Sequence, residues 1–103
     1  MIDKRKFYIN GQWVSPSKPN DYEVINPSTE EAFATISLGS TEDTNAAVSA
    51  AKKALVSWSE SSKDERLNLL EKLLSIYKKR YGEMADAISM EMGAPMDLSL
   101  IHI

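Results

Sequence analysis

The segment from Glu23 to Ile36 constrains the fold most, because it predicts two β-strands joined by a turn. Val24-Ile25 and the run 33–36 are rich in the β-branched and apolar residues that strands prefer. Between them, Asn-Pro-Ser-Thr at 26–29 consists of turn formers. A strand-rich start precedes this segment and a helical periodicity follows it, so the order of elements indicates an α+β domain.

A second hairpin is predicted upstream. Residues 6–9 and 12–14 flank Asn10-Gly11, the pair best suited to a type I′ turn, because both central residues of that turn need positive φ. Two prolines and short polar residues mark 15–21 as a loop. We expect four short strands before residue 38. Since a lone hairpin is marginally stable, the two hairpins must pair with each other or with another element.

Three helices are expected after the strands. The first is alanine-rich, is capped by Ser40 or Thr41 and ends at Trp58. The second begins with a capping box formed by Ser62 and Glu65. Its apolar positions spread well beyond the narrow seam of a coiled coil, so this helix is expected to contact more than one neighbour.

The third helix is expected over residues 83–91, with Gly82 interrupting the chain before it. Gly93 suits a left-handed C-cap, and Pro95 confirms the stop. Trp13 and Trp58 are interpreted as packing anchors rather than as lining of a substrate channel.

Composition excludes several classes of function. The 103 residues correspond to about one small domain, and a net charge of −3 gives no electrostatic reason to bind nucleic acid or an anionic membrane. No apolar run approaches the ~18 residues of a membrane span, and the N-terminus lacks a signal peptide, so a cytoplasmic location is expected. The absence of cysteine removes any disulfide, thiolate metal site or cysteine nucleophile.

Five blocks, in order and in register, resemble the N-terminal fifth of an aldehyde dehydrogenase. The resemblance covers residues 6–97, and its blocks are 7–13, 24–31, the helix ending at Trp58, 63–66 and 91–95. It departs at Ala94, where many members of the family carry lysine, and this leaves the subfamily open.

The resemblance implies the N-terminal part of an NAD- or NADP-binding domain in an enzyme that oxidises an aldehyde to a carboxylic acid. It also implies a homo-oligomer, a dimer or a tetramer. The family's cysteine nucleophile, its glutamate base and a glycine-rich dinucleotide turn have no counterpart here, so no catalytic or cofactor-binding residue is predicted and the chain alone should be inert. The alternative is a free-standing α+β protein-interaction module.

The resemblance implies one further site. Some family members hold a structural monovalent cation with two successive carbonyls before the Asn-Pro pair and an acidic side chain two residues before the Gly of the Gly-x-Pro block. The matching positions are Val24, Ile25 and Glu91. Oxygen ligands suit a hard ion. The alternative is that Glu91 is a solvated carboxylate and that the other two are ordinary strand residues.

The last six residues are expected to lie outside the domain. Leu-Ser-Leu-Ile-His-Ile is what CTG-TCT-CTT-ATA-CAC-ATC encodes, a transposon adapter used in sequencing libraries, so 98–103 is predicted to be an adapter-derived tail after a domain at 1–97. The lone His102 falls within this tail, and we assign it no catalytic or metal-binding role.

Overall fold

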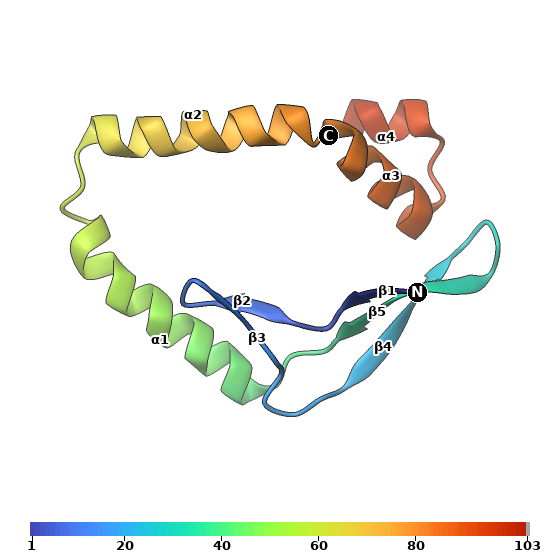
Figure 1. The fold of residues 1–103 in the computed structure, drawn as a ribbon, viewed down its shortest axis with the longest axis horizontal. Helices are drawn as coiled ribbons and strands as arrows, with labels where there is room; N and C mark the ends of the chain where they lie inside the picture. The colour runs from blue at the N-terminus through green and yellow to red at the C-terminus, as the bar shows by residue number, and fades with distance from the viewer. Residues whose placement is uncertain (103) are drawn as a thin grey trace. The chain divides into compact units, whose positions relative to one another are not determined.

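The computed structural model describes residues 1–102, which form five strands followed by four helices (Figure 1). The elements are β1 (Ile2–Lys4), β2 (Phe7–Ile9), β3 (Gln12–Val14), β4 (Asp21–Asn26), β5 (Glu31–Ser37), α1 (Thr41–Trp58), α2 (Lys63–Lys79), α3 (Tyr81–Met92) and α4 (Met96–His102). The chain divides into two compact units. The first contains Met1–Ile25 and Ala32–Glu60, and the second contains Asn26–Glu31 and the residues from Ser61 onward.

The hairpin β2–β3 confirms the upstream prediction. The strands pair antiparallel, with Tyr8 opposite Trp13, and the rings of these two residues lie 5.2 Å apart. At the turn, Asn10 has φ of 53° and Gly11 has φ of 76°. Both values are positive, as a type I′ turn requires.

The other strands form a separate sheet in the order β1-β5-β4. Only four residues join β4 to β5, too few for a parallel crossover, so these two strands form the predicted second hairpin. The hairpins share no sheet. Instead, β5 pairs in parallel with β1, Ile2 lying opposite Ala34. Strand β1 was not predicted, because Ile-Asp-Lys is short, carries two charges and is exposed at every position.

Serine side chains begin both long helices, as predicted. Ser40 caps α1 in a capping box with Asp43. At α2, the Ser62 N–H donates to Glu65 Oε2 over 2.7 Å, and the Glu65 N–H donates to Ser62 Oγ over 3.1 Å. These bonds satisfy N–H groups that have no partner within the helix, which fixes where each helix starts.

The break between α2 and α3 lies at Arg80 rather than at Gly82, so the predicted interruption was wrong by two residues. Arg80 leaves the helical region, with φ of −100° and ψ of 13°, and its guanidinium pairs with Glu83 at 2.8 Å. Gly82 lies inside α3. One glycine costs a helix only about 1 kcal/mol, so it does not by itself end one.

The helix α3 ends at Gly93, whose φ of 73° confirms the predicted left-handed C-cap. A fourth helix, α4, then follows, which the sequence did not predict. It packs on α3, since Ser99 is fully buried and the Tyr81 hydroxyl donates to the Leu100 carbonyl. The side chain of His102 and all of Ile103 lie outside the described residues.

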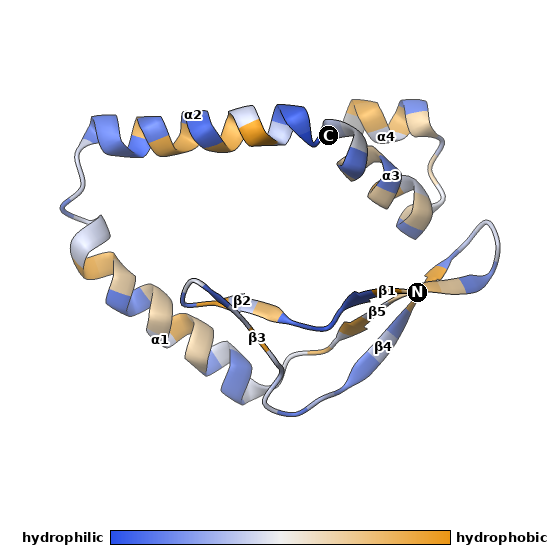
Figure 2. Cartoon of the chain, in the orientation of Figure 1, coloured by the Kyte–Doolittle hydropathy of each residue, from blue (hydrophilic) through white to orange (hydrophobic). Residues whose placement is uncertain are grey.

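Few apolar side chains are buried. Among the described residues, only Ala34 and Ala85 form an apolar core. The accessible area is 8297 Å², against the roughly 5,800 Å² that a folded monomer of this mass exposes. Of the two predicted packing anchors, Trp13 is 67% exposed although its ring contacts that of Tyr8, and Trp58 is 45% exposed. Figure 2 shows that apolar segments lie along α1 and α2. Their side chains are largely outside the small core.

The polypeptide of 103 residues is therefore expected to unfold with weak cooperativity and to self-associate. With so little apolar area removed from water, its thermal transition should be broad and should depend on protein concentration. Differential scanning calorimetry at several concentrations checks this. A sharp two-state transition of a monomer would contradict it.

Candidate functional site

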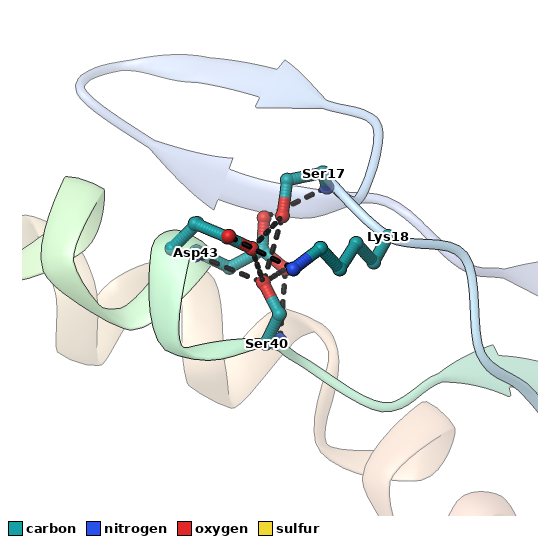
Figure 3. A network of polar contacts seen from close by, with 5 residues as sticks. Ser17, Lys18, Ser40 and Asp43 are labelled. Atoms are coloured by element: carbon teal, nitrogen blue, oxygen red, sulfur yellow. Dashed lines mark hydrogen bonds and ion pairs between the residues drawn. The ribbon is translucent and has the colours of Figure 1, made fainter.

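The densest polar cluster joins the loop after β3 to the start of α1, within the first unit (Figure 3). Asp43 is at its centre. Its Oδ2 accepts from the Ser40 N–H and from the Ser40 hydroxyl, each over 2.9 Å, and its Oδ1 accepts from the Ser17 N–H over 2.9 Å. One carboxylate thus caps the helix and also holds a loop that lies 26 residues away in the sequence.

A second carboxylate completes the cluster. Glu42 pairs with Lys18 at 2.9 Å, and its other oxygen accepts from Ser40 Oγ over 3.2 Å. The hydroxyls of Ser17 and Ser40 lie 2.7 Å apart. Because two acidic side chains already oppose the positive end of the helix dipole, the cluster stabilises the fold rather than offering an anion site.

Hydrogen bonding favours the ionised form of both acids. The N–H of Ser40, followed by that of Ser17, holds the pKa of Asp43 below its usual range. Lys18, followed by the Ser40 hydroxyl, lowers the pKa of Glu42. Both acids are therefore ionised at neutral pH and act as acceptors, not as proton donors.

A second charged group lies at the sheet of β1, β5 and β4. Arg5 pairs with Asp3 at 2.8 Å and with Asp21 at 3.2 Å, and the Arg5 hydrogen bonds lower the pKa of Asp3 to about 2. All three side chains are largely exposed, so these pairs contribute little to stability. The group includes no nucleophile and no general base of raised pKa.

The predicted cation ligands lie in two different units. Val24 and Ile25 are in β4, and Glu91 is an exposed residue in the last turn of α3. Ile25 is 47% exposed. Within the part of the chain that the structure describes, no group of three His, Cys, Asp or Glu side chains could hold a metal ion. Backbone carbonyls fall outside that search, so this site stays a prediction.

The second unit brings together two turns of the chain that are far apart in the sequence. The turn after β4 is closed by bonds to the Asn26 carbonyl from Thr29 (3.3 Å) and Glu30 (2.8 Å). Its Pro27 packs against the end of α3, where a Cβ added to Gly93 would lie 2.9 Å from Pro27 Cγ. Sequence reasoning identified both segments separately and missed their contact, because nothing in a single sequence reports which turns meet.

Asn26 has the local role expected of it. Its Oδ1 accepts from the Ser28 N–H over 2.9 Å, an Asx-type bond within the turn. The side chain is therefore used in shaping the turn rather than in binding an oxyanion.

The lengths and compositions of the helices show whether any of them could cross a membrane. Across residues 1–102, none of them combines the length and the apolar character that a bilayer crossing demands.

Comparison with known proteins identifies the class. A model of the aldehyde dehydrogenase family matches residues 13–103, so the chain belongs to that family. It is 49% identical to a 3-succinoylsemialdehyde-pyridine dehydrogenase of a Pseudomonas species, over 93% of this chain and 20% of that protein. It is 43% identical to a putative aldehyde dehydrogenase of Staphylococcus epidermidis, over 91% of this chain and 20% of that protein.

Solved structures agree with this assignment. An aldehyde dehydrogenase from Bartonella henselae superposes with a TM-score of 0.95 at 59% identity, over 98% of this chain and 21% of that one. Aldehyde dehydrogenase C of Pseudomonas syringae, in complex with NAD+ and octanal, gives a TM-score of 0.90 at 38% identity, over 93% of this chain and 20% of that one. The chain therefore spans about a fifth of the length of its relatives.

We expect Gly93→Ala to weaken the contact between the turn and α3. The positive φ alone should cost about 1–2 kcal/mol, and the added methyl group would also press on Pro27. Amide hydrogen exchange in α3 should become faster, which mass spectrometry can measure.

Gly82→Ala is the matched control for that substitution. A Cβ there meets nothing within 4 Å and the residue is helical, so α3 should gain about 0.5–1 kcal/mol. Equal exchange rates in the two variants would contradict the role assigned to Gly93.

The attachment of the loop to α1 should be lost in acid. Since the folded pKa of Asp43 lies below the unfolded value of ~3.9, its contribution is complete above that value and disappears as pH falls through the folded pKa. A carbon-detected NMR titration of the carboxyl group should show a midpoint below ~3.9, the pKa of aspartate in an unfolded peptide.

Two substitutions at Ser17 separate the causes of that shift. Ser17→Pro removes the N–H and should raise the Asp43 midpoint, whereas Ser17→Ala keeps the N–H and should change it less. Identical titrations in the two variants would show that the Ser17 N–H does not contribute to the shift.

Proposed function

We propose that this chain is the N-terminal part of an NAD- or NADP-dependent aldehyde dehydrogenase that oxidises an aldehyde to a carboxylic acid. The observation that carries the proposal is the likeness to the Bartonella henselae enzyme, which has a TM-score of 0.95 over 98% of this chain. The Pseudomonas syringae enzyme, solved with NAD+ and octanal, supports the cofactor and the substrate class. Membership of this family also argues against a free-standing interaction module.

The 103 residues contribute structure rather than chemistry. A bound nicotinamide cofactor would accept hydride from the substrate. The resemblance assigns nucleophilic attack to a cysteine, and this chain has none. Its two polar clusters consist of ionised carboxylates already engaged with cations and N–H donors. In the full-length enzyme, residues 1–97 would therefore form one part of the cofactor-binding domain.

Activity assays test the proposal directly. The full-length protein should reduce NAD+ or NADP+ in the presence of an aldehyde, followed by absorbance at 340 nm, while the 103-residue chain should give no rate above buffer. Lack of activity of the full-length protein across aliphatic, aromatic and semialdehyde substrates would refute the proposal.

We also propose the structural cation site of Val24, Ile25 and Glu91. Support comes from the resemblance, which matches both segments, and from the ligands that they would supply, two main-chain carbonyls and one carboxylate. Hard oxygen ligands suit Na⁺ or K⁺.

Replacing the acidic ligand tests this site. In the full-length protein, the melting temperature should rise with added KCl or NaCl relative to choline chloride at equal ionic strength, because a bound ion stabilises the folded state. Glu91→Gln should abolish that difference, and Glu83→Gln, on the same helix, should leave it intact. No difference between the salts in the parent protein would exclude a structural cation.

Three further features are proposed. A homo-oligomer, dimer or tetramer, and a cytoplasmic location follow from the resemblance, and light scattering and cell fractionation would test them. An adapter origin of residues 98–103 rests on their amino-acid sequence alone, which is the one that such an adapter would encode. Because the family match runs to residue 103, only the underlying nucleotides can decide it.

A further inference from the structure

The tip of the hairpin of β2 and β3 (Figure 1) carries an asparagine that a glycine follows. The chain has five asparagines, and Asn10, with Gly11 after it, is the only one in such a pair. The other four precede Asp21, Pro27, Ala46 and Leu69. Asn10 and Gly11 are both exposed, and they form the turn between the paired residues Ile9 and Gln12. Asn10 therefore differs from the other asparagines both in its neighbour and in its place in the fold.

An asparagine side chain can be attacked by the main-chain nitrogen of the residue that follows it. Once base removes the proton of that N–H, the nitrogen forms a bond to Cγ and ammonia leaves, which gives a succinimide ring. Water then opens the ring at either carbonyl and leaves aspartate or isoaspartate. The net change is the replacement of NH2 by OH, with no oxidation or reduction. Because the nitrogen must approach Cγ closely, a following residue without a side chain favours ring closure.

The surroundings of Gly11 leave that approach open. A Cβ placed on Gly11 would meet nothing within 4 Å, and its N–H donates to no carbonyl among the turn and loop bonds of residues 1–102. The Asn10 side chain likewise has no hydrogen-bond partner in this part of the chain. Asn26 is the contrast, because its Oδ1 accepts from Ser28 and the nitrogen of Pro27 carries no hydrogen to lose.

The turn opposes the reaction while it is formed. Ring closure requires the Gly11 nitrogen to eclipse Cβ of Asn10. In a type I′ turn, whose first central residue has ψ of about +30°, that nitrogen lies nearly trans to Cβ instead. The positive φ of both residues, 53° and 76°, identifies this turn type. The hairpin must therefore open before Asn10 can react.

We infer that Asn10 is a site of spontaneous deamidation in the full-length protein, and that opening of the β2–β3 hairpin sets its rate. Each strand has only three residues, and the Tyr8 and Trp13 rings, 5.2 Å apart, provide its cross-strand packing. Trp13 is largely exposed, so little buried apolar area opposes opening. The chemistry needs only water and base, whatever reaction the full-length protein catalyses.

The two products have different effects on the hairpin. Aspartate leaves the main chain unchanged, and Asp-Gly suits a type I′ turn as Asn-Gly does. Isoaspartate routes the main chain through Cβ and Cγ, which adds an atom to a turn that has a fixed length. The strands then cannot return to their register. The contact of Phe7 with Gly39, where an added Cβ would lie 3.7 Å from the Phe7 ring, is weakened with them.

Mass spectrometry of the full-length protein tests which asparagine reacts. The protein is incubated at mildly alkaline pH in water enriched in heavy oxygen, so that only a ring opened during the incubation takes up the label, and is then digested with pepsin in acid. Asn10 should be labelled at least ~10-fold faster than Asn45 in α1 and Asn68 in α2, whose helices restrict rotation of the main chain. Equal labelling of the three would overturn the assignment to Asn10.

The same incubation in urea tests the protection by the turn. Labelling of Asn10 should be measurable in buffer and at least ~10-fold faster in urea, where the hairpin is open. Equal rates would show that the turn does not protect Asn10. Labelling confined to urea would show that the folded protein is not modified. Either result overturns the inference.

Trp13→Ala and Tyr22→Ala form a matched pair of variants. Trp13→Ala removes the ring contact with Tyr8 and should speed the labelling of Asn10 in buffer by about two- to tenfold. Tyr22→Ala removes an exposed ring from β4, in the other sheet, and should change the rate by less than about twofold. Equal rates in the two variants would overturn the role of the hairpin. If Trp13→Ala does not fold, the comparison with urea in the unsubstituted protein decides the same question.

Amide exchange compares the two products. Asn10→Asp should keep the exchange rates of β2 and β3, whereas the isoaspartyl protein, isolated after the incubation, should exchange at least ~10-fold faster in both strands. Unchanged exchange in the isoaspartyl protein would contradict the loss of the hairpin.

Discussion

The first unit depends on the carboxylate of Asp43. Its two oxygens accept bonds from the N–H and hydroxyl of Ser40 and from the N–H of Ser17, so it fixes both the start of α1 and the path of the loop after β3. Few apolar contacts are available to do this, since Ala34 is the one buried apolar residue described in this unit. Directional polar bonds therefore define the geometry here more than packing does.

The second unit relies on a steric contact instead. Pro27 occupies the space that a side chain on Gly93 would need, and the left-handed conformation of Gly93 ends α3 at that point. Rigid Pro27 and the Asx-type bond of Asn26 define the shape of the turn before it meets the helix. Two segments 66 residues apart in the sequence thus meet through a steric fit between Pro27 and Gly93, and no charged group takes part in it.

The elements that the sequence predicted are those encoded by local chemistry. Asn10-Gly11 specified its turn through positive φ, and Ser62 with Glu65 specified the start of α2 through bonds within four residues. The features that were missed depend on distant partners. Strand β1 exists because β5 lies beside it, and α4 packs on α3 through Ser99. The residues proposed to bind a cation come from segments far apart in the sequence, so local patterns could name these residues but not their geometry.

The exposed apolar side chains of α2 have a consequence during synthesis. In a protein five times as long, this helix leaves the ribosome when four-fifths of the chain is still to be made. At bacterial rates of about 5–20 residues per second, that interval lasts roughly tens of seconds. Six exposed leucine and isoleucine side chains on one helix are a ready target for a chaperone that binds nascent chains. The folding yield of such an enzyme would then depend on how long these side chains stay exposed to solvent.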